Sequence, residues 1–140
     1  MKILKTTQPE SNVLVMDVLD TGLIQHLLIT ADHHMDNAKS LHWLIKRDFE
    51  EAKIRDAHVF MFGDTLDAMD GAKDRRSVKG QTREENVGAN YFDLLVKNAV
   101  KLYKDYAGYI KVISQGNHET AIIKHNETDL IARLVNRLRN

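Results

Sequence analysis

Three polar clusters carry the side chains of this sequence that are best suited to bind a metal ion, and each cluster follows an apolar run. These side chains offer carboxylate, imidazole and amide donors, a mixture that suits a divalent cation such as Mn²⁺, Fe²⁺ or Zn²⁺. The chain contains no cysteine, so a metal site has to be built from His, Asp, Glu or Asn. The clusters are Asp32 with His34, Asp64 with Asp67, and Asn117 with His118.

The apolar runs before these clusters have the composition of buried strands. They cover residues 23–31, 57–62 and 109–114, and β-branched and aromatic residues are frequent in them. The run at 23–31 is nearly all apolar in its second half, which predicts a strand covered on both faces of its sheet. Residues 12–19 are also strand-like, and the turn at 20–22 allows a hairpin with the run that follows.

Helical patterns separate the three strands and follow the last one. Apolar residues recur at helical spacing within 41–52 and 87–106, and Ser40 is a candidate N-cap for the first of these segments. A last helix runs to the end of the chain after a capping-box-like start at 126–129. Residues 67–86 are polar without a clear period, which predicts a long loop.

The alternation of strands and helices predicts an α/β fold, in which a parallel or mixed sheet is flanked by helices. Parallel strands place their carboxyl ends at one edge of the sheet, where open α/β sheets bind their ligands. The three polar clusters therefore converge at this edge in the predicted fold. His33 points away from Asp32 and His34 in an extended segment, so we expect it to pack or to lie at the substrate rim rather than to bind metal.

Length and composition favour one domain that covers residues 1–140, with residues 1–11 as a loose polar leader. Twenty basic residues balance twenty acidic residues, so no overall field attracts nucleic acid. The N-terminal stretch lacks the apolar segment of a signal peptide, and no run has the length of a membrane span. These features predict a cytoplasmic protein that does not bind membranes.

The three clusters resemble the motifs of the calcineurin-like metallophosphoesterases. The pattern D-x-H matches Asp32 and His34, G-D-x-x-D matches residues 63–67, and G-N-H-E matches residues 116–119. The motifs stand in the order of that family, each at a predicted strand end, and the resemblance spans roughly residues 27–120. The stretches GNHET and HNETDL also resemble a phage-type branch of the family.

The resemblance implies a centre with two divalent metal ions. Asp32 and His34 would bind the first ion, and Asp64 would bridge this ion to the second. Asn117 would bind the second ion through its amide oxygen. We expect Mn²⁺ at both positions, with Fe²⁺ and Zn²⁺ as alternatives. A hydroxide activated by the ions would attack phosphorus in line.

The resemblance also implies catalytic roles for two further side chains. His118 would act as the general acid at the leaving-group oxygen. Asp67 would orient a neighbouring side chain. Gly63 and Gly116 would let the backbone turn sharply beside the metal ions.

The sequence departs from the family pattern after His118. The family completes its metal shells with a further His and a terminal G-H-x-H motif, whereas this chain has only His125 after His118. His125 is a candidate substitute for one of the missing ligands. Three alternatives follow: a truncated chain, one half of a split enzyme whose partner supplies the histidines, or a stand-alone protein with a weaker or single-metal site. The first two imply half of the family's α/β/β/α core, with an exposed apolar sheet face and self-association.

The function implied by the resemblance is metal-dependent hydrolysis of a phosphoester, with DNA or a nucleotide as the expected substrate. The second motif lacks the D-R-G form of the protein Ser/Thr phosphatases, which favours a phosphodiesterase or nuclease. Arg75 and Arg76 of the long loop are candidate phosphate contacts, although such charge clusters are more often simply solvated. The alternative from another class is a non-catalytic metal-binding module, or a split half that needs a partner segment.

Overall fold

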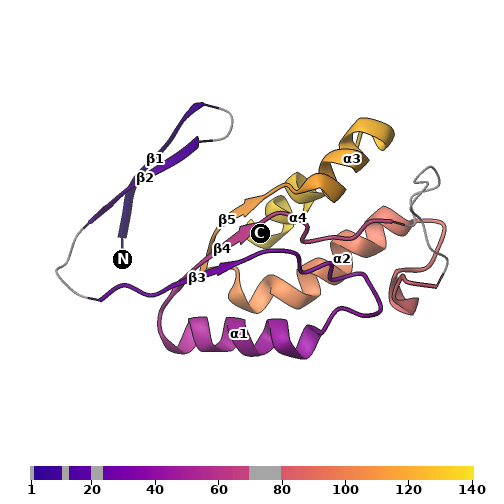
Figure 1. Cartoon of the computed structure of the whole chain (residues 1–140), viewed down its shortest axis with the longest axis horizontal. Coiled ribbons are helices and arrows are strands. Elements are labelled where there is room, and N and C mark those ends of the chain that lie inside the picture. Colours follow the sequence, from indigo (N-terminus) through magenta and orange to yellow (C-terminus); the bar gives the residue numbers. More distant parts are fainter. Residues whose placement is uncertain (1, 11–12, 20–23, 70–79) are drawn as a thin grey trace.

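The structure is a computed structural model, and it describes residues 2–10, 13–19, 24–69 and 80–140. Figure 1 shows a hairpin of two strands at one side and a second sheet with helices packed beside it. No helix in the described ranges is long and apolar enough to cross a membrane. The elements are β1 (Lys2–Glu10), β2 (Val13–Leu19), β3 (Leu27–Thr30), α1 (His42–Ile54), β4 (His58–Phe62), η1 (Glu84–Asn86), α2 (Tyr91–Tyr103), η2 (Lys104–Tyr106), β5 (Ile110–Ser114), α3 (Asn117–Asn126) and α4 (Leu130–Arg139).

The central sheet is parallel and has three strands in the order β3, β4, β5. Leu28 of β3 is paired with Val59 of β4, and Val59 is paired in turn with Ile110 of β5. Helix α1 connects β3 to β4, and the connection from β4 to β5 contains α2, as parallel pairing requires. The predicted α/β architecture is confirmed, and the carboxyl ends of the three strands point to the same edge of the sheet.

Helices cover one face of this sheet and build the core with it. Val59 and Met61 of β4 are at most 1% exposed, and they belong to one buried cluster with Phe49 of α1 and Leu95 of α2. Burial of apolar side chains of this size stabilises a fold by about 1.5–3 kcal/mol for each side chain. The core therefore fixes the strands whose ends carry the polar clusters.

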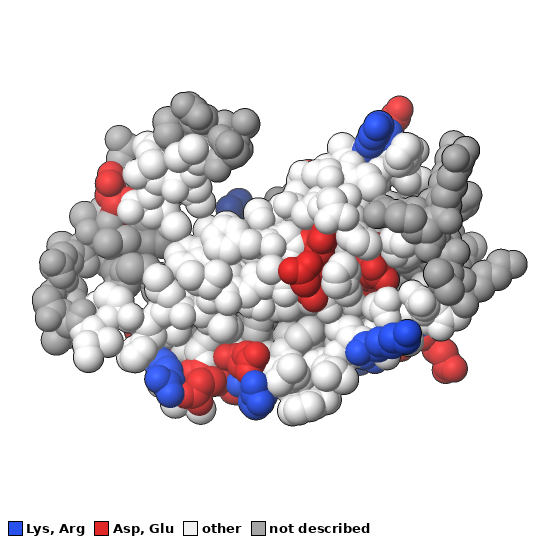
Figure 2. Space-filling view, viewed as in Figure 1, with Lys and Arg blue, Asp and Glu red and all other residues white. Residues whose placement is uncertain are grey.

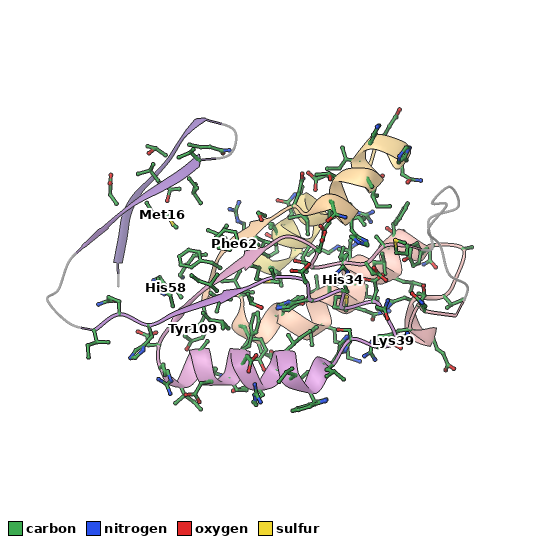
Figure 3. All side chains as sticks on the ribbon, viewed as in Figure 1. Met16, His34, Lys39, His58, Phe62 and Tyr109 are labelled. Carbon is green, nitrogen blue, oxygen red and sulfur yellow. The ribbon has the colours of Figure 1, made fainter. Side chains whose placement is uncertain are left out.

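The opposite face of the sheet is apolar but only partly covered. Leu27 and Ile29 of β3 are 50% and 65% exposed, and Phe62 of β4 is 50% exposed. Figure 3 labels Phe62 on the side of the sheet that is nearer the hairpin. The prediction that β3 is covered on both faces is wrong, because α1 packs on the other face and leaves these side chains in contact with water.

The hairpin of β1 and β2 was not predicted from the sequence. Thr6 pairs with Met16, and Thr7 pairs with Val15, in antiparallel register. Residues 2–10 therefore form a strand and not a loose leader, and β2 pairs with β1 rather than with the run that follows it. The polar character of β1 has a physical reason, because a two-stranded hairpin outside the core leaves Thr6 and much of Val15 exposed.

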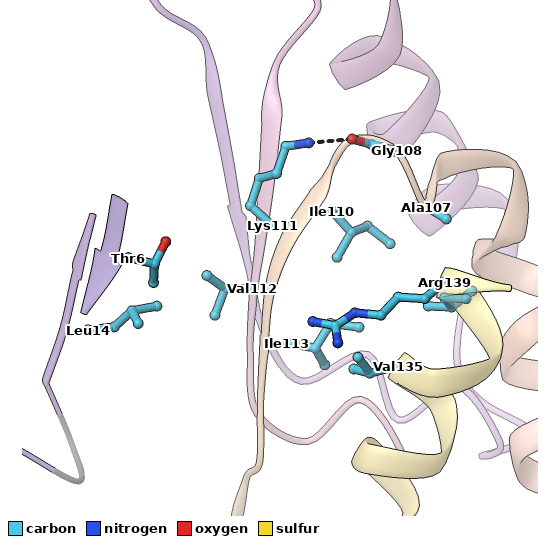
Figure 4. Close-up of a pocket in the computed structure, with 11 residues that line it drawn as sticks. Thr6, Leu14, Ala107, Gly108, Ile110, Lys111, Val112, Ile113, Val135 and Arg139 are labelled. Atoms are coloured by element: carbon cyan, nitrogen blue, oxygen red, sulfur yellow. Dashed lines mark hydrogen bonds between the residues drawn. The ribbon is translucent and has the colours of Figure 1, made fainter. Parts of the chain in front are cut away.

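A cavity of about 540 Å³ separates the hairpin from β5 and α4. Leu14 of the hairpin lines one side of it, and Val112 of β5 and Val135 of α4 lie across the cavity from Leu14 (Figure 4). Arg139, at the end of α4, extends along the same wall. The hairpin therefore contributes little to the core that positions the strand ends.

The polar stretch after β5 begins a helix, which differs from the turn expected there. Helix α3 starts at Asn117, and Gly116 is its N-cap. Asn117 and His118 consequently lie in the first turn of a helix. This position at the helix start matters because the N–H groups of the first turn have no partner within the helix. Side chains of other segments can accept hydrogen bonds from these N–H groups.

The observed starts of α1 and α4 agree only in part with the N-caps predicted from the sequence. Leu41, and not Ser40, is the N-cap of α1, because the Ser40 hydroxyl donates instead to the carbonyl oxygen of His33 at 2.7 Å. Asp129 caps α4 by accepting a hydrogen bond from the N–H of Ala132 at 2.8 Å. The predicted capping box at 126–129 is therefore wrong in register, because Asn126 ends α3 and Asp129 is itself the N-cap of α4.

Candidate metal centre

The chain segments after β3 and β4 run side by side and bring the first two polar clusters together. The N–H of Asp32 donates to the carbonyl oxygen of Gly63 at 3.2 Å, and the N–H of His34 donates to that of Asp64 at 3.0 Å. Figure 3 shows His34 at the carboxyl ends of the strands, and Figure 2 shows acidic side chains gathered on the same part of the surface. Pairing thus continues beyond the strands and fixes the spacing of the candidate ligands.

Four residues of these segments hold the left-handed backbone conformation, which non-glycine residues adopt rarely. The φ angles are 56° at Asp32, 41° at His34, 47° at Asp64 and 51° at Ala68. A backbone conformation of this kind lowers stability by of order 1–3 kcal/mol for each residue. It is kept only where contacts with the surrounding structure hold it in place. Two buried carboxylates provide this support.

Glu119 is the first of them, and it is fully buried between the segment after β4 and the start of α3. Its Oε2 accepts hydrogen bonds from the N–H groups of Asp64 at 3.1 Å and of Gly116 at 2.8 Å. Its Oε1 accepts a third from the N–H of Leu66 at 2.9 Å. The N–H of His118 in turn donates to Asp64 Oδ1 at 3.0 Å. Glu119 therefore fixes Asp64 relative to His118.

Asp36 is the second buried carboxylate, and it holds the turn that carries Asp67. Its Oδ1 accepts from the N–H of Asp67 at 2.6 Å, and its Oδ2 accepts from the N–H of Ala68 at 2.9 Å. Burial raises the pKa of Asp36, while these two hydrogen bonds favour its charged form. The Tyr91 hydroxyl adds a longer contact to Oδ2 at 3.3 Å. Asp67 is thereby held at a fixed place beside the histidines.

Asp32, His34 and Asp64 form a group of ligands for a cation. One potential ligand atom from each residue lies within 4.8 Å of the others, which is close to twice a metal–ligand bond of about 2.0–2.2 Å. His34 Nε2 lies 3.8 Å from Asp32 Oδ1. Two carboxylates and one imidazole suit a divalent cation, so these residues fit the metal ion that the sequence predicts.

A second group, formed by His34, Asp67 and His118, meets the same distance criterion of 4.8 Å. It faces the other nitrogen of the His34 ring, since His34 Nδ1 lies 3.2 Å from Asp67 Oδ1. A neutral imidazole has a free lone pair on only one nitrogen, so the two groups compete for one His34 ring. His34 Nδ1 is buried without a hydrogen-bond partner in the described structure. If His34 held a cation through Nε2, Nδ1 would be able to donate to Asp67, the arrangement in which a carboxylate orients a metal-binding histidine.

Asp67 and His118 form a contact pair beside the first ligand group. His118 Nδ1 lies 2.7 Å from the carbonyl oxygen of Asp67 and 3.4 Å from its carboxylate Oδ1. A carbonyl oxygen can only accept, so Nδ1 carries the proton, and the neutral ring has its lone pair on Nε2. Asn37 donates from Nδ2 to Asp67 Oδ2 at 2.7 Å and fixes the carboxylate. The pair therefore offers an oriented imidazole next to the candidate ligands.

Two of the remaining candidates, Asn117 and His125, lie on α3. Asn117 is exposed at the first position of α3, adjacent to His118. His125 is exposed in the last turn of the same helix, about 10 Å along the helix axis from His118. Arg75 and Arg76 belong to a segment outside the described residues.

His33 has the packing role that its place in an extended segment predicts. Its Nε2 lies 2.7 Å from the Thr30 hydroxyl, and its Nδ1 lies 2.8 Å from the Tyr103 hydroxyl. Burial lowers the pKa of His33 from 6.5 to about 4, so the ring is neutral at pH 7. Both ring nitrogens have partners within the fold, and neither is free for a metal ion.

Sequence reasoning missed the three residues that position this site, which are Asp36, Asn37 and Glu119. Glu119 had a detectable signal, because it stands three residues after Gly116, the spacing at which a glutamate caps the start of a helix. No local sequence signal marks Asp36 and Asn37, since their partner Asp67 lies about thirty residues away in the sequence.

Replacing Gly116 by alanine should damage the centre, because no space exists for a side chain there. A Cβ atom at Gly116 would lie 2.1 Å from Asp64 Oδ1 and 2.3 Å from the Asp64 nitrogen. Asp64 has to move to relieve this clash. Overpacking of this kind lowers the free energy of unfolding by about 1–3 kcal/mol. Urea unfolding should show a lower midpoint, and calorimetry should show weaker Mn²⁺ binding. Gly108→Ala is the matched control, since nothing lies within 4 Å of its Cβ position; equal behaviour of the two variants would contradict the geometry.

Comparisons of the chain with protein-family models, with curated proteins and with solved structures gave no significant match. The functional inference is therefore carried by the contacts within this chain and by its motifs. These contacts comprise three candidate ligands at the ends of β3 and β4, a His–Asp pair beside them, and two buried carboxylates that hold both in place.

Proposed function

We propose that this chain is a metal-dependent phosphoester hydrolase whose catalytic centre lies at the carboxyl ends of β3, β4 and β5. The observation that carries the proposal is the grouping of Asp32, His34 and Asp64 directly beside the pair of Asp67 and His118. The grouping combines ligands for a cation with an imidazole that can transfer a proton. These are the two components that hydrolysis of a phosphoester requires.

Asp32, His34 and Asp64 would hold the first of two divalent cations, with Mn²⁺ as the expected metal. A bound divalent cation supplies charge stabilisation to the phosphoryl oxygens and activates water for attack on phosphorus. Asp64 and Asn117 are the residues proposed to bind the second ion. The backbone contacts of Glu119 keep Asp64 at a fixed distance from the start of α3, where Asn117 lies.

His118 is the proposed general acid. Its Nδ1 donates to the Asp67 carbonyl oxygen at 2.7 Å, so a second proton on the ring has to be carried by Nε2. The carboxylate of Asp67 also lies beside this ring, with Oδ1 at 3.4 Å from Nδ1. His118 would then give the Nε2 proton to the ester oxygen that leaves.

A phosphodiester, as in DNA or a nucleotide, is the proposed substrate class. The support is the G-D-x-x-D motif at residues 63–67, which is followed by Ala68 and Met69 and lacks the D-R-G form of the protein phosphatases. The resemblance of the GNHET stretch to phage-type members favours DNA metabolism. A nuclease or nucleotide phosphodiesterase is therefore proposed over a protein phosphatase.

The second candidate function is a non-catalytic metal-binding module, or a split half that needs a partner segment. The observation that favours it is the number of ligands, since the described His, Asp and Glu residues provide only one imidazole for the first ligand group. Asn117 is moreover exposed in the first turn of α3. A module of this kind binds Mn²⁺ but does not turn over a phosphoester.

Substitution of His118 separates the two candidates. Wild-type protein with Mn²⁺ should hydrolyse the phosphodiester bond of a dinucleotide, whose leaving alkoxide needs a proton. EDTA should abolish the reaction, and His118→Ala should lower kcat by about 10²–10⁴-fold, the usual contribution of a general acid. Mn²⁺ affinity, measured by calorimetry, should stay unchanged in His118→Ala if the ion binds at Asp32, His34 and Asp64. The control is His125→Ala, which alters an exposed histidine of the same helix. An inactive wild type that binds Mn²⁺ would favour the non-catalytic module, and full activity of His118→Ala would exclude this role for His118.

A further inference from the structure

A cavity of about 320 Å³ lies between the segment after β3 and the first half of α1. Its volume is at the lower end of the range of roughly 300–1,000 Å³ for small-molecule sites. Asp32 is one of the residues that line it. The cavity, called the α1 cavity below, therefore opens beside a candidate metal ligand.

The walls of the α1 cavity are mostly apolar. Leu41, Leu44 and Ile45 of the α1 region line it, and the buried ring of Phe49 lies behind them. Leu41 is 52% exposed, so a ligand in the cavity would remove apolar surface from water and gain about 25 cal/mol for each Å². These walls suit the aromatic or aliphatic part of a small organic group.

Two carboxylates provide the ionised groups of the lining. The side chain of Asp32 is 70% exposed, and that of Asp48 is 44% exposed. Arg47 donates both of its hydrogen bonds to Asp48 Oδ1, at 2.7 and 2.9 Å, which leaves Oδ2 able to accept from a ligand. A carboxylate accepts hydrogen bonds and attracts cations, and it repels phosphates and other anions.

The side chains of His33, Thr30 and Ser40, which also line the cavity, already have hydrogen-bond partners within the fold. Both ring nitrogens of His33 have partners, and one of these is the Thr30 hydroxyl. The hydroxyl of Ser40 donates to the carbonyl oxygen of His33. A ligand that enters the cavity therefore meets apolar walls and carboxylate acceptors.

We propose that the α1 cavity binds the organic group of the substrate, and that this group is largely apolar, uncharged or cationic, and carries an N–H or O–H donor. A phosphoester bound to a cation at Asp32, His34 and Asp64 would have one of its ester substituents close to the cavity, because Asp32 belongs to both the ligand group and the lining. Oδ2 of Asp48, which accepts neither hydrogen bond from Arg47, accepts a hydrogen bond from the donor of this substituent. An aromatic amine and a nucleobase both belong to this class. The identity of the ligand as part of a substrate rests on the hydrolase function proposed above, whereas the binding site itself does not.

Two probes of matched size and opposite charge test the proposal on the metal-free chain. Phenethylamine and 3-phenylpropionate share a phenyl ring and a two-carbon linker but differ in the sign of their charge. Methyl ¹H–¹³C NMR spectra of the full chain should show saturable shifts of the Leu44 and Ile45 signals with phenethylamine. The same signals should respond at least about tenfold more weakly to 3-phenylpropionate, because Asp32 repels its carboxylate and the two carboxylates of the lining can accept hydrogen bonds but cannot donate them.

A variant of Asp48 and a matched control complete the test. Asp48→Asn should weaken phenethylamine binding about three- to fivefold, as expected for a partly exposed ion pair. Asp105→Asn makes the same change at an exposed aspartate outside the cavity lining and should leave the affinity unchanged. The binding measurement needs no turnover, so a failure of the hydrolase proposal leaves its outcome interpretable. Absence of shifts at Leu44 and Ile45, equal binding of both probes, or equal effects of the two variants would overturn the proposal.

Discussion

His34→Ala is expected to reduce the affinity of the chain for Mn²⁺ by at least about 100-fold, since it removes the imidazole ligand itself rather than a group that orients it. His34 is the one residue common to both ligand groups at this centre. Its loss therefore weakens cation binding whichever of the two groups the ion occupies. Isothermal titration calorimetry with Mn²⁺ at pH 7 measures the effect directly.

A matched histidine shows whether the effect of His34→Ala is local. His125→Ala removes an exposed imidazole from the last turn of α3 and should leave Mn²⁺ affinity unchanged. A loss of affinity in His125→Ala would instead support His125 as a substitute ligand. Equal Mn²⁺ affinities of wild type and His34→Ala would show that the ion binds elsewhere.

Glu119→Ala is expected to have the largest effect on stability, a loss of about 3–5 kcal/mol in the free energy of unfolding. The carboxylate of Glu119 is completely buried and accepts hydrogen bonds from the N–H groups of Asp64, Leu66 and Gly116. Its removal leaves two buried donors and one partly buried donor without this partner, and it opens a cavity beside them. Urea unfolding followed by circular dichroism should show a clearly lower midpoint.

Two further variants define the origin of this loss. Glu119→Gln keeps one acceptor oxygen but places an NH₂ group against one of the donors, so its destabilisation should be intermediate. Glu51→Ala removes an exposed glutamate of α1, paired only with Arg55 on the surface, and should change stability by no more than about 0.5 kcal/mol. A Glu119→Ala protein as stable as Glu51→Ala would contradict the role of Glu119 in holding the site.

The sheet could be predicted from the sequence because its strands have strong local signals. All residues from His58 to Met61 in β4 are buried, and the sequence there is nearly all apolar. Strand β2 was predicted at residues 12–19, but β1 gave no such signal, because its described side chains are polar and mostly exposed. Helix α3 was missed for a similar reason, since its first turn carries polar residues that contact the segments after β4 rather than the core.

The location of the candidate site could be predicted because it follows from topology. Parallel strands bring Asp32, His34 and Asp64 to one edge whatever the details of the loops. The residues that position these side chains could not be predicted, since Asp36 and Glu119 act on backbone groups thirty or more residues away. Such contacts depend on the left-handed backbone turns after β3 and β4, which no local sequence pattern specifies.

The most direct test of the central claim is anomalous X-ray diffraction from crystals of the full chain that have been soaked in Mn²⁺. A metal centre at the carboxyl ends of the strands predicts an anomalous peak bonded to His34 Nε2 and to the carboxylates of Asp32 and Asp64. A peak on the other side of the ring, between His34 Nδ1, Asp67 and His118, would assign the ion to the second ligand group. A crystal that is saturated with Mn²⁺ and has no peak beside His34 would contradict the claim.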